Sequence, residues 1–140
     1  MRNPDSIRPW QFALEPLYGY ILLAKKLYEG KKEFSGAWNF GPDDKNYLKV
    51  RELVEEAIRI LKKGSYIVKR DNTKHEAEHL QLDISKAKNI LGWQPIFNLN
   101  KTLKFTFDWY RSFYEKKEIV DITHQQIELF FKEIYELPSL

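Results

Sequence analysis

The chain has 140 residues, of which 43% are hydrophobic, 15% aromatic and 31% charged, with a net charge of +3 and no cysteine. This length suits one domain with a core of its own, and so many aromatic residues exclude an intrinsically disordered chain. The lack of cysteine excludes disulfide scaffolds, cysteine zinc sites, thiol catalysis and iron–sulfur centres, and the well-mixed charges give little support for nucleic-acid binding.

The first forty residues predict an extended segment, a helix and a short strand. Met1–Glu15 contains prolines that push the residues before them out of the helical region, so we expect it to be extended. A helix should begin near Pro16 and end at Gly30, and Gly19 within it should let another backbone approach closely. Ala37–Phe40 is a predicted strand. The helix carries one apolar stripe, made of Leu17, Tyr20, Ile21, Ala24 and Leu27.

The middle of the chain predicts a second amphipathic helix between two loops. Asp43–Tyr47 is a predicted polar loop, and the helical period returns from about Lys49 until Gly64 ends it. Tyr66–Val68 is a predicted β-branched strand, and Arg70–Glu78 is polar enough to be a loop. The side chains expected to face inward are Val50, Leu53, Val54, Ala57, Ile58 and Leu61.

The last sixty residues predict three further helices. Leu80–Asp83 alternates and is expected to be briefly extended. A short helix over Ile84–Leu91 is predicted between an aspartate N-cap and a glycine C-cap. A long helix should follow the cap residue Asn98 and end near Lys117, and Thr123 should cap a final helix. The chain is therefore about half helix with a few short strands.

Residues 75–79 match the H-E-x-x-H pattern of zinc proteases. That pattern needs a helix, which places both histidines on one face and the glutamate as general base. Here the flanking residues favour a loop, and in an extended chain the imidazoles of His75 and His79 would lie roughly 13 Å apart, too far to share a metal. We therefore expect a polar surface loop and no metal site.

Catalytic motifs are not evident in this sequence. The glycines are scattered singly, so neither a phosphate loop nor a dinucleotide-binding fingerprint can be written. We also expect the chain to hold no nucleophile elbow and no Tyr-x-x-x-Lys catalytic pair. Arg8, held beside an aromatic ring by Pro9, suits either a phosphate contact or a surface salt bridge, and the residues alone leave both open.

The chain contains several short motifs in a fixed order: R-P-W-Q, E-P, W-N-F-G-P, H-E-A and D-x-S-K-A…L-G-W-x-P. They lie at Arg8–Gln11, Glu15–Pro16, Trp38–Pro42, His75–Ala77, Asp83–Ala87 and Leu91–Pro95. Together they resemble one family, CDP-glucose 4,6-dehydratase, within the extended short-chain dehydrogenases/reductases. The first four are most typical of this family, whereas the last is shared more widely among sugar-nucleotide enzymes. The resemblance covers almost the whole chain but only about the last third of a family member.

The resemblance implies a reaction whose catalytic groups lie in a part of the family that this chain does not match. Family members convert CDP-glucose to CDP-4-keto-6-deoxyglucose with bound NAD, a step toward deoxysugars and O-antigen precursors. The glycine-rich NAD loop and the Tyr-x-x-x-Lys pair belong to the N-terminal lobe of the family, so this chain is not expected to be catalytic alone or to bind NAD. It is expected to supply sugar-nucleotide binding.

Three residues are the candidate substrate contacts that the resemblance implies. Arg8 matches an arginine that meets the nucleotide diphosphate, a role that suits its planar fork. Glu76 falls where relatives place an acidic residue near the nucleotide ribose, although a solvated loop carboxylate is the alternative. Lys74 is a possible second cation toward the diphosphate. The tryptophans Trp10, Trp38 and Trp93 are assigned to packing.

These observations predict an α+β, mostly helical chain in which residues 1–140 form a single sugar-nucleotide-binding, C-terminal region of an extended Rossmann-type enzyme, without a complete Rossmann domain. The alternative is a helical protein-interaction module that uses an exposed aromatic face. We expect weak binding of CDP-glucose, an NAD-binding lobe supplied in trans, and self-association through the surface that such a lobe would cover. The longest apolar run, Tyr20–Ala24, is too short to span a membrane, and no secretory leader opens the sequence, so we expect a cytoplasmic protein.

Overall fold

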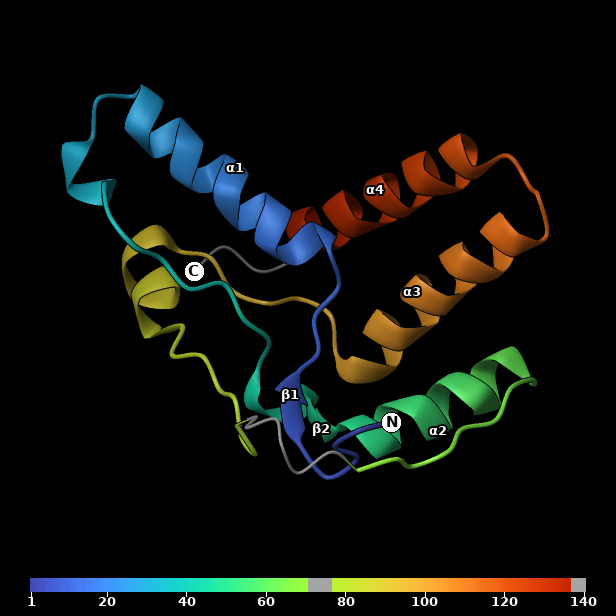
Figure 1. Cartoon of the computed structure of the whole chain (residues 1–140). Helices are drawn as coiled ribbons and strands as arrows, with labels where there is room; N and C mark the ends of the chain where they lie inside the picture. The colour runs from blue at the N-terminus through green and yellow to red at the C-terminus, as the bar shows by residue number, and fades with distance from the viewer. Residues whose placement is uncertain (71–76, 137–140) are drawn as a thin grey trace.

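The computed structural model describes residues 1–70 and 77–136, and within them the chain is mostly helical, as predicted, with one two-stranded sheet. In Figure 1 the helix pair α3 and α4 lies on one side of the molecule, α1 reaches away on the other, and α2 runs beside the small sheet below. The elements are β1 (Ile7–Pro9), α1 (Leu14–Tyr28), the 3-10 turns η1 (Lys32–Phe34) and η2 (Asp44–Asn46), β2 (Tyr47–Lys49), α2 (Val50–Leu61), the π-helical turn η3 (Ala87–Leu91), α3 (Leu99–Tyr114) and α4 (Ile119–Glu136).

Three of the predicted cap residues in the second half of the chain make the expected capping contacts or turns. The Asn98 side chain accepts a hydrogen bond from the Lys101 backbone N–H at 3.0 Å, so α3 begins where its cap places it. Asp83 likewise accepts from the Ser85 N–H at 2.9 Å ahead of η3. Gly92 ends η3 in the left-handed region with φ of 73°, a conformation that glycine adopts without steric cost.

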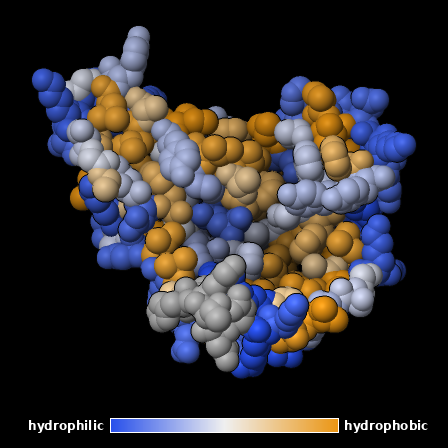
Figure 2. All heavy atoms as spheres, in the orientation of Figure 1, coloured by the Kyte–Doolittle hydropathy of each residue, from blue (hydrophilic) through white to orange (hydrophobic). Residues whose placement is uncertain are grey.

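Helix α1 is confirmed, but its core-facing side is not the stripe that its apolar residues suggested. It begins two residues before Pro16, and Tyr18, Leu22 and Leu23 pack against the core. Leucine, tyrosine and isoleucine side chains of the stripe are exposed instead, with Ile21 at 60%. Figure 2 shows this apolar surface on the upper part of the molecule. At Gly19 the close neighbour is the ring of Phe40, not a backbone: a Cβ there would lie 2.4 Å from it.

Two predicted strands are absent from the described structure, and two others take their place. Ala37–Phe40 and Tyr66–Val68 have no strand conformation. Composition favours strands there, but a strand forms only where a neighbour supplies backbone hydrogen bonds, and within the described residues Ala37–Phe40 has no such neighbour. The strands that do form, β1 and β2, are three residues each, too short for alternation to reveal them.

The final helix begins earlier than predicted. Helix α4 starts at Ile119, and Thr123 lies one turn inside it. The Thr123 hydroxyl donates to the Ile119 carbonyl at 2.8 Å and accepts from the Trp109 indole at 2.9 Å. It therefore ties α4 to α3 and does not cap a helix start.

Two apolar clusters hold the elements together. The first gathers around η3 and the buried Trp93, with α1 packed on it. The second is aromatic: Phe12, Phe97 and Phe130 meet where α1, the segment before α3 and α4 converge, and Phe12 stacks on Phe97 with ring centroids 5.3 Å apart. Both clusters lie beneath the start of α1, so the segment carrying β1 is anchored to the core on its C-terminal side.

Candidate site on the strand layer around Arg8

The predicted substrate arginine lies in a small layer of three extended segments. Strand β1 pairs antiparallel with β2, with Arg8 opposite Leu48. On the other edge of β1, Ile7 forms a parallel bridge with His79 and donates its N–H to the Glu78 carbonyl at 2.8 Å. Residues far apart in the sequence thus meet along β1.

Arg8 stands in the centre of this layer and is half-buried. One of its guanidinium nitrogens, Nη1, donates to the Ile7 carbonyl at 2.8 Å. Because side chains alternate along a strand, Arg8 shares a face with Trp10, and across the ladder with Leu48. A guanidinium fixed on a strand keeps its fork in one place, which is the arrangement that phosphate recognition requires.

The other two predicted substrate residues, Glu76 and Lys74, lie outside the described residues, as does His75. The described part of the segment begins at Ala77, where the chain comes alongside β1. His79 is exposed and stacks on Tyr47 with ring centroids 6.3 Å apart. Residues 77–80 are not helical, and the remainder of the H-E-x-x-H match lies outside the described residues.

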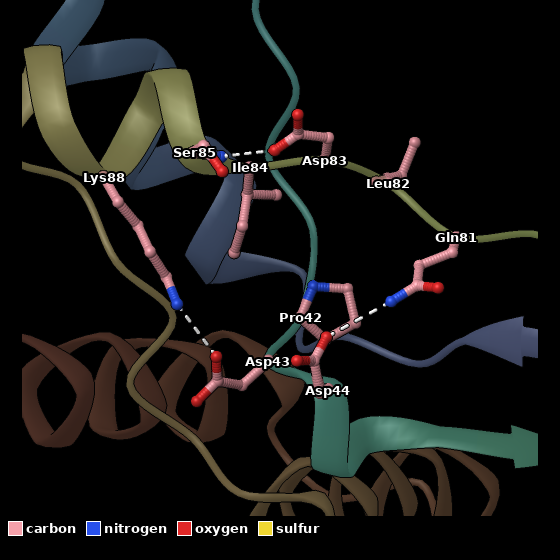
Figure 3. A pocket seen from close by; sticks show the side chains of 9 residues that line it. All are labelled: Pro42, Asp43, Asp44, Gln81, Leu82, Asp83, Ile84, Ser85 and Lys88. Carbon is pink, nitrogen blue, oxygen red and sulfur yellow. Dashed lines mark hydrogen bonds and ion pairs between the residues drawn. The ribbon is translucent and has the colours of Figure 1, made fainter.

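A polar pocket of about 490 Å³ continues from this segment and was not predicted from the sequence. Figure 3 shows its side chains, contributed by residues 42–44, 81–85 and 88. Lys88 pairs with Asp43 at 2.9 Å, and Gln81 donates to Asp44 at 3.3 Å. These contacts join the segment before β2 to η3, so the polar groups of the pocket are engaged in holding the two segments together.

Glu15 is a buried carboxylate that sequence reasoning recorded only as part of a motif. It is 1% exposed, and its Oε1 accepts from the backbone N–H groups of Ile96 at 2.6 Å and Phe97 at 2.8 Å. Burial raises the pKa of Glu15, and the hydrogen bonds from Phe97 and Ile96 oppose that rise. The carboxylate therefore connects the start of α1 to the segment before α3.

The tryptophans assigned to packing differ in what they contact. Trp93 is fully buried, and Trp38 stacks on Phe34 with ring centroids 5.9 Å apart, as expected for packing residues. Trp10 is half-buried and is in neither apolar cluster of the described structure. Its indole N–H donates to the Leu48 carbonyl at 3.1 Å.

One expectation about catalytic motifs needs correction. The sequence does contain a Tyr-x-x-x-Lys spacing, at Tyr28 and Lys32. Helix α1 ends at Tyr28, and Gly30 turns the chain with φ of 79° before Lys32 enters η1. A catalytic pair of this type needs both residues on one helix face, and Tyr28 is 94% exposed, so this match does not form an acid–base pair.

The chain is similar in sequence to a known protein. The chain is 38% identical over 128 residues to CDP-glucose 4,6-dehydratase of Salmonella typhimurium. The match covers 91% of this chain and 36% of that protein, so the chain spans about a third of the length of its relative. No protein-family model matches. The relationship confirms the resemblance that the motifs predicted.

Among the helices of residues 1–70 and 77–136, none combines the length and the apolar character that crossing a bilayer requires.

Proposed function

We propose that this chain is the sugar-nucleotide-binding part of a CDP-glucose 4,6-dehydratase and that Arg8 contacts the diphosphate of CDP-glucose. The observation that carries the proposal is the position of Arg8 in the middle of a layer of three extended segments. The segment that follows the H-E-A motif in the sequence runs beside β1, which carries part of the R-P-W-Q motif, and it bridges to β1 at His79. Such convergence is expected of a binding site and not of a single surface salt bridge.

Glu76 and Lys74 complete the proposed contacts. Both precede the segment that bridges to β1 by only a few residues. Glu76 is proposed to contact the ribose and Lys74 to add a second cation toward the diphosphate, whose charge an ammonium stabilises as a point charge. In this proposal residues 1–140 act as one binding region without a complete Rossmann domain.

The redox chemistry of the family lies outside this region. Bound NAD would accept and return a hydride in the complete enzyme. The glycines of this chain are isolated and those with positive φ end helices or turns, so the described residues do not form a dinucleotide cradle. No catalytic step is therefore assigned to this chain alone.

The exposed stripe of α1 is proposed to receive the NAD-binding lobe in trans. Ile21 is 60% exposed on a helix whose other side is in the core. Ala37–Phe40, whose Phe40 ring contacts Gly19 of α1, has no backbone pairing among the described residues. An apolar helix face next to a segment with unpaired backbone is a surface suited to the edge of a partner's sheet.

The alternative function, a helical interaction module that uses an exposed aromatic face, receives no support from the comparison with known proteins. The relative is a sugar-nucleotide enzyme by name. Both functions would use the apolar surface of α1, in one case for the NAD-binding lobe and in the other for a different protein partner. The presence of that surface therefore does not distinguish them, whereas binding of CDP-glucose does.

Isothermal calorimetry tests the proposal. CDP-glucose should bind the full 140-residue chain weakly, and Arg8→Ala should reduce the affinity about 10-fold or more, since a charge-assisted contact to phosphate is lost. Arg59→Ala is the matched control, because Arg59 is an exposed arginine of α2 paired with Glu56. Equal affinities for the Arg8 and Arg59 variants, or no heat from folded wild-type protein, would refute the proposal.

A further inference from the structure

Trp10 has the position and the exposure of a ligand contact. It follows β1 directly, and its backbone N–H continues the β1–β2 ladder by donating to the Asn46 carbonyl at 3.2 Å. Residues two apart on a strand point to the same side, so the indole of Trp10 and the guanidinium of Arg8 share a face with their Cα atoms roughly 7 Å apart. The aromatic ring of Trp10 therefore lies two residues along the strand from Arg8, the residue proposed to contact the diphosphate.

Packing does not account for this tryptophan as it does for the others. Trp93 fills the first cluster, Trp38 stacks on Phe34, and Trp109 stacks on Phe113 with centroids 5.7 Å apart. Among the described residues no ring contact and no cluster includes Trp10. Trp10 is partly buried, so part of its indole is accessible to a ligand.

The ring is also held in a fixed orientation. Its Nε1–H donates to the Leu48 carbonyl on the neighbouring strand at 3.1 Å, which satisfies the polar edge and fixes the plane of the indole. A preorganised aromatic face beside a cation suits a ligand that has a planar ring at one end and phosphates at the other, because little side-chain entropy is lost on binding.

We propose that Trp10 is the platform on which the nucleobase of the substrate stacks, while Arg8 contacts the diphosphate. This inference rests on the proposed function and assigns the other end of the same ligand. Stacking on an aromatic side chain is tolerant of base identity, because every base has a π-face. Trp10 therefore contributes affinity for nucleotides in general and does not itself select cytosine.

Two substitutions separate stacking from structural effects. Trp10→Phe and Trp10→Leu both remove the hydrogen bond to Leu48, but only phenylalanine keeps a ring. Calorimetry is done with two probes: CDP carries both the base and the diphosphate, whereas inorganic pyrophosphate carries the phosphates alone. We expect Trp10→Leu to weaken CDP binding about 10-fold and Trp10→Phe to weaken it only slightly, with pyrophosphate binding unchanged in both.

The other outcomes overturn the inference in distinguishable ways. If wild-type protein binds CDP and Trp10→Leu binds it equally well, stacking is refuted and the proposed function stands. If Trp10→Leu loses CDP and pyrophosphate alike, Trp10 only supports the geometry of Arg8. If the folded wild-type chain binds neither probe, the proposed function fails and this inference fails with it. Circular dichroism of each variant establishes that it is folded.

Discussion

At the scale of single residues, Glu15 shows how a polar group becomes structural. The carboxylate is buried at the start of α1, where its Oε1 accepts two backbone N–H groups from the segment before α3. The Trp93 indole donates to the Glu15 backbone carbonyl at 3.0 Å. One residue therefore holds three backbone or indole donors that would otherwise be buried without partners, which is costly in a protein interior.

Removing this carboxylate should destabilise the fold. We expect Glu15→Ala to lower the free energy of unfolding by about 2–4 kcal/mol, because the N–H groups of Ile96 and Phe97 lose their acceptor. Glu15→Gln keeps an acceptor oxygen and should cost much less. Urea denaturation of the three proteins measures the difference, and equal losses for the alanine and glutamine variants would contradict the assigned hydrogen bonds.

The same residue predicts a pH dependence of stability. Burial raises the folded-state pKa of Glu15 above its ordinary value of 4.5, so the folded state holds a proton that the unfolded state has released. Its contribution to stability is complete below pH 4.5 and is lost as the pH rises through the folded-state pKa. The wild-type chain should therefore lose stability relative to Glu15→Gln as the pH rises above 4.5.

Comparing these two proteins at each pH removes the effect of carboxylates whose pKa values are lowered, such as Asp83, since they are common to both. Denaturation at a series of pH values supplies the difference. A constant difference across the range, or one with the opposite sign, would show that the folded-state pKa of Glu15 is not raised.

Gly19 offers a second test at this scale. Alanine would favour the helix by up to about 1 kcal/mol, but its Cβ would meet the ring of Phe40, which itself lies 5.0 Å from the Trp93 ring by centroids. We expect overpacking to prevail, so that Gly19→Ala lowers stability by about 1–2 kcal/mol. The double variant with Phe40→Leu should show a smaller loss than the sum of the single changes, and additive losses would contradict this contact.

At the scale of elements, caps and periodicity predicted helices well and strands poorly. A helix satisfies its own backbone, so Asn98, Asp83 and Gly92 suffice to mark where α3 and η3 begin or end. A strand depends on a neighbour. Ala37–Phe40 has the residues of a strand and lacks a described partner, whereas β1 forms because β2 and residues 78–80 lie on its two sides.

The face of α1 could not be predicted for a related reason. Its apolar residues form more than one stripe, and the sequence does not say which stripe has a partner in this chain. Tyr18, Leu22 and Leu23 meet the clusters, and the expected stripe remains outside. Arg8 was singled out as a candidate by its motif and stays a prediction, whereas the pocket lined by residues 42–44, 81–85 and 88 depends on long-range contacts that no local pattern encodes.

The cap of α3 can be tested directly. Asn98→Ala removes the acceptor for the Lys101 N–H and should lower the free energy of unfolding by about 1 kcal/mol, while Asn98→Asp should preserve it. Thermal or urea denaturation gives the values. An alanine variant as stable as the aspartate variant would mean that α3 begins without help from its cap.

At the scale of the whole molecule, the main feature is an apolar surface without a described partner. The chain covers about a third of its relative, and the exposed stripe of α1 lies over the upper part of the molecule in Figure 2. Exposed apolar patches on a protein tend to be interfaces or sites of association. In the absence of the proposed lobe, we expect a second copy of the chain to cover the exposed stripe of α1.

We therefore expect the isolated chain to form dimers or larger species in sedimentation experiments at high concentration. Ile21→Glu should shift the population toward the monomer, because Ile21 is 60% exposed in the stripe. Val120→Glu is the matched control: Val120 is 59% exposed but lies at the start of α4, away from α1 in Figure 1. A wild-type chain that stays monomeric, or equal effects of both variants, would contradict association through α1.

The central claim, that the layer around Arg8 binds a sugar nucleotide, is tested most directly by an NMR titration of the isotopically labelled chain with CDP-glucose. We predict that backbone amide shifts change along β1, β2 and residues 77–80, and that α3 and α4 near residues 109–120 are unaffected. Arg8→Ala should abolish those changes. Shift changes confined to other elements, or none at saturating ligand, would contradict the proposed site.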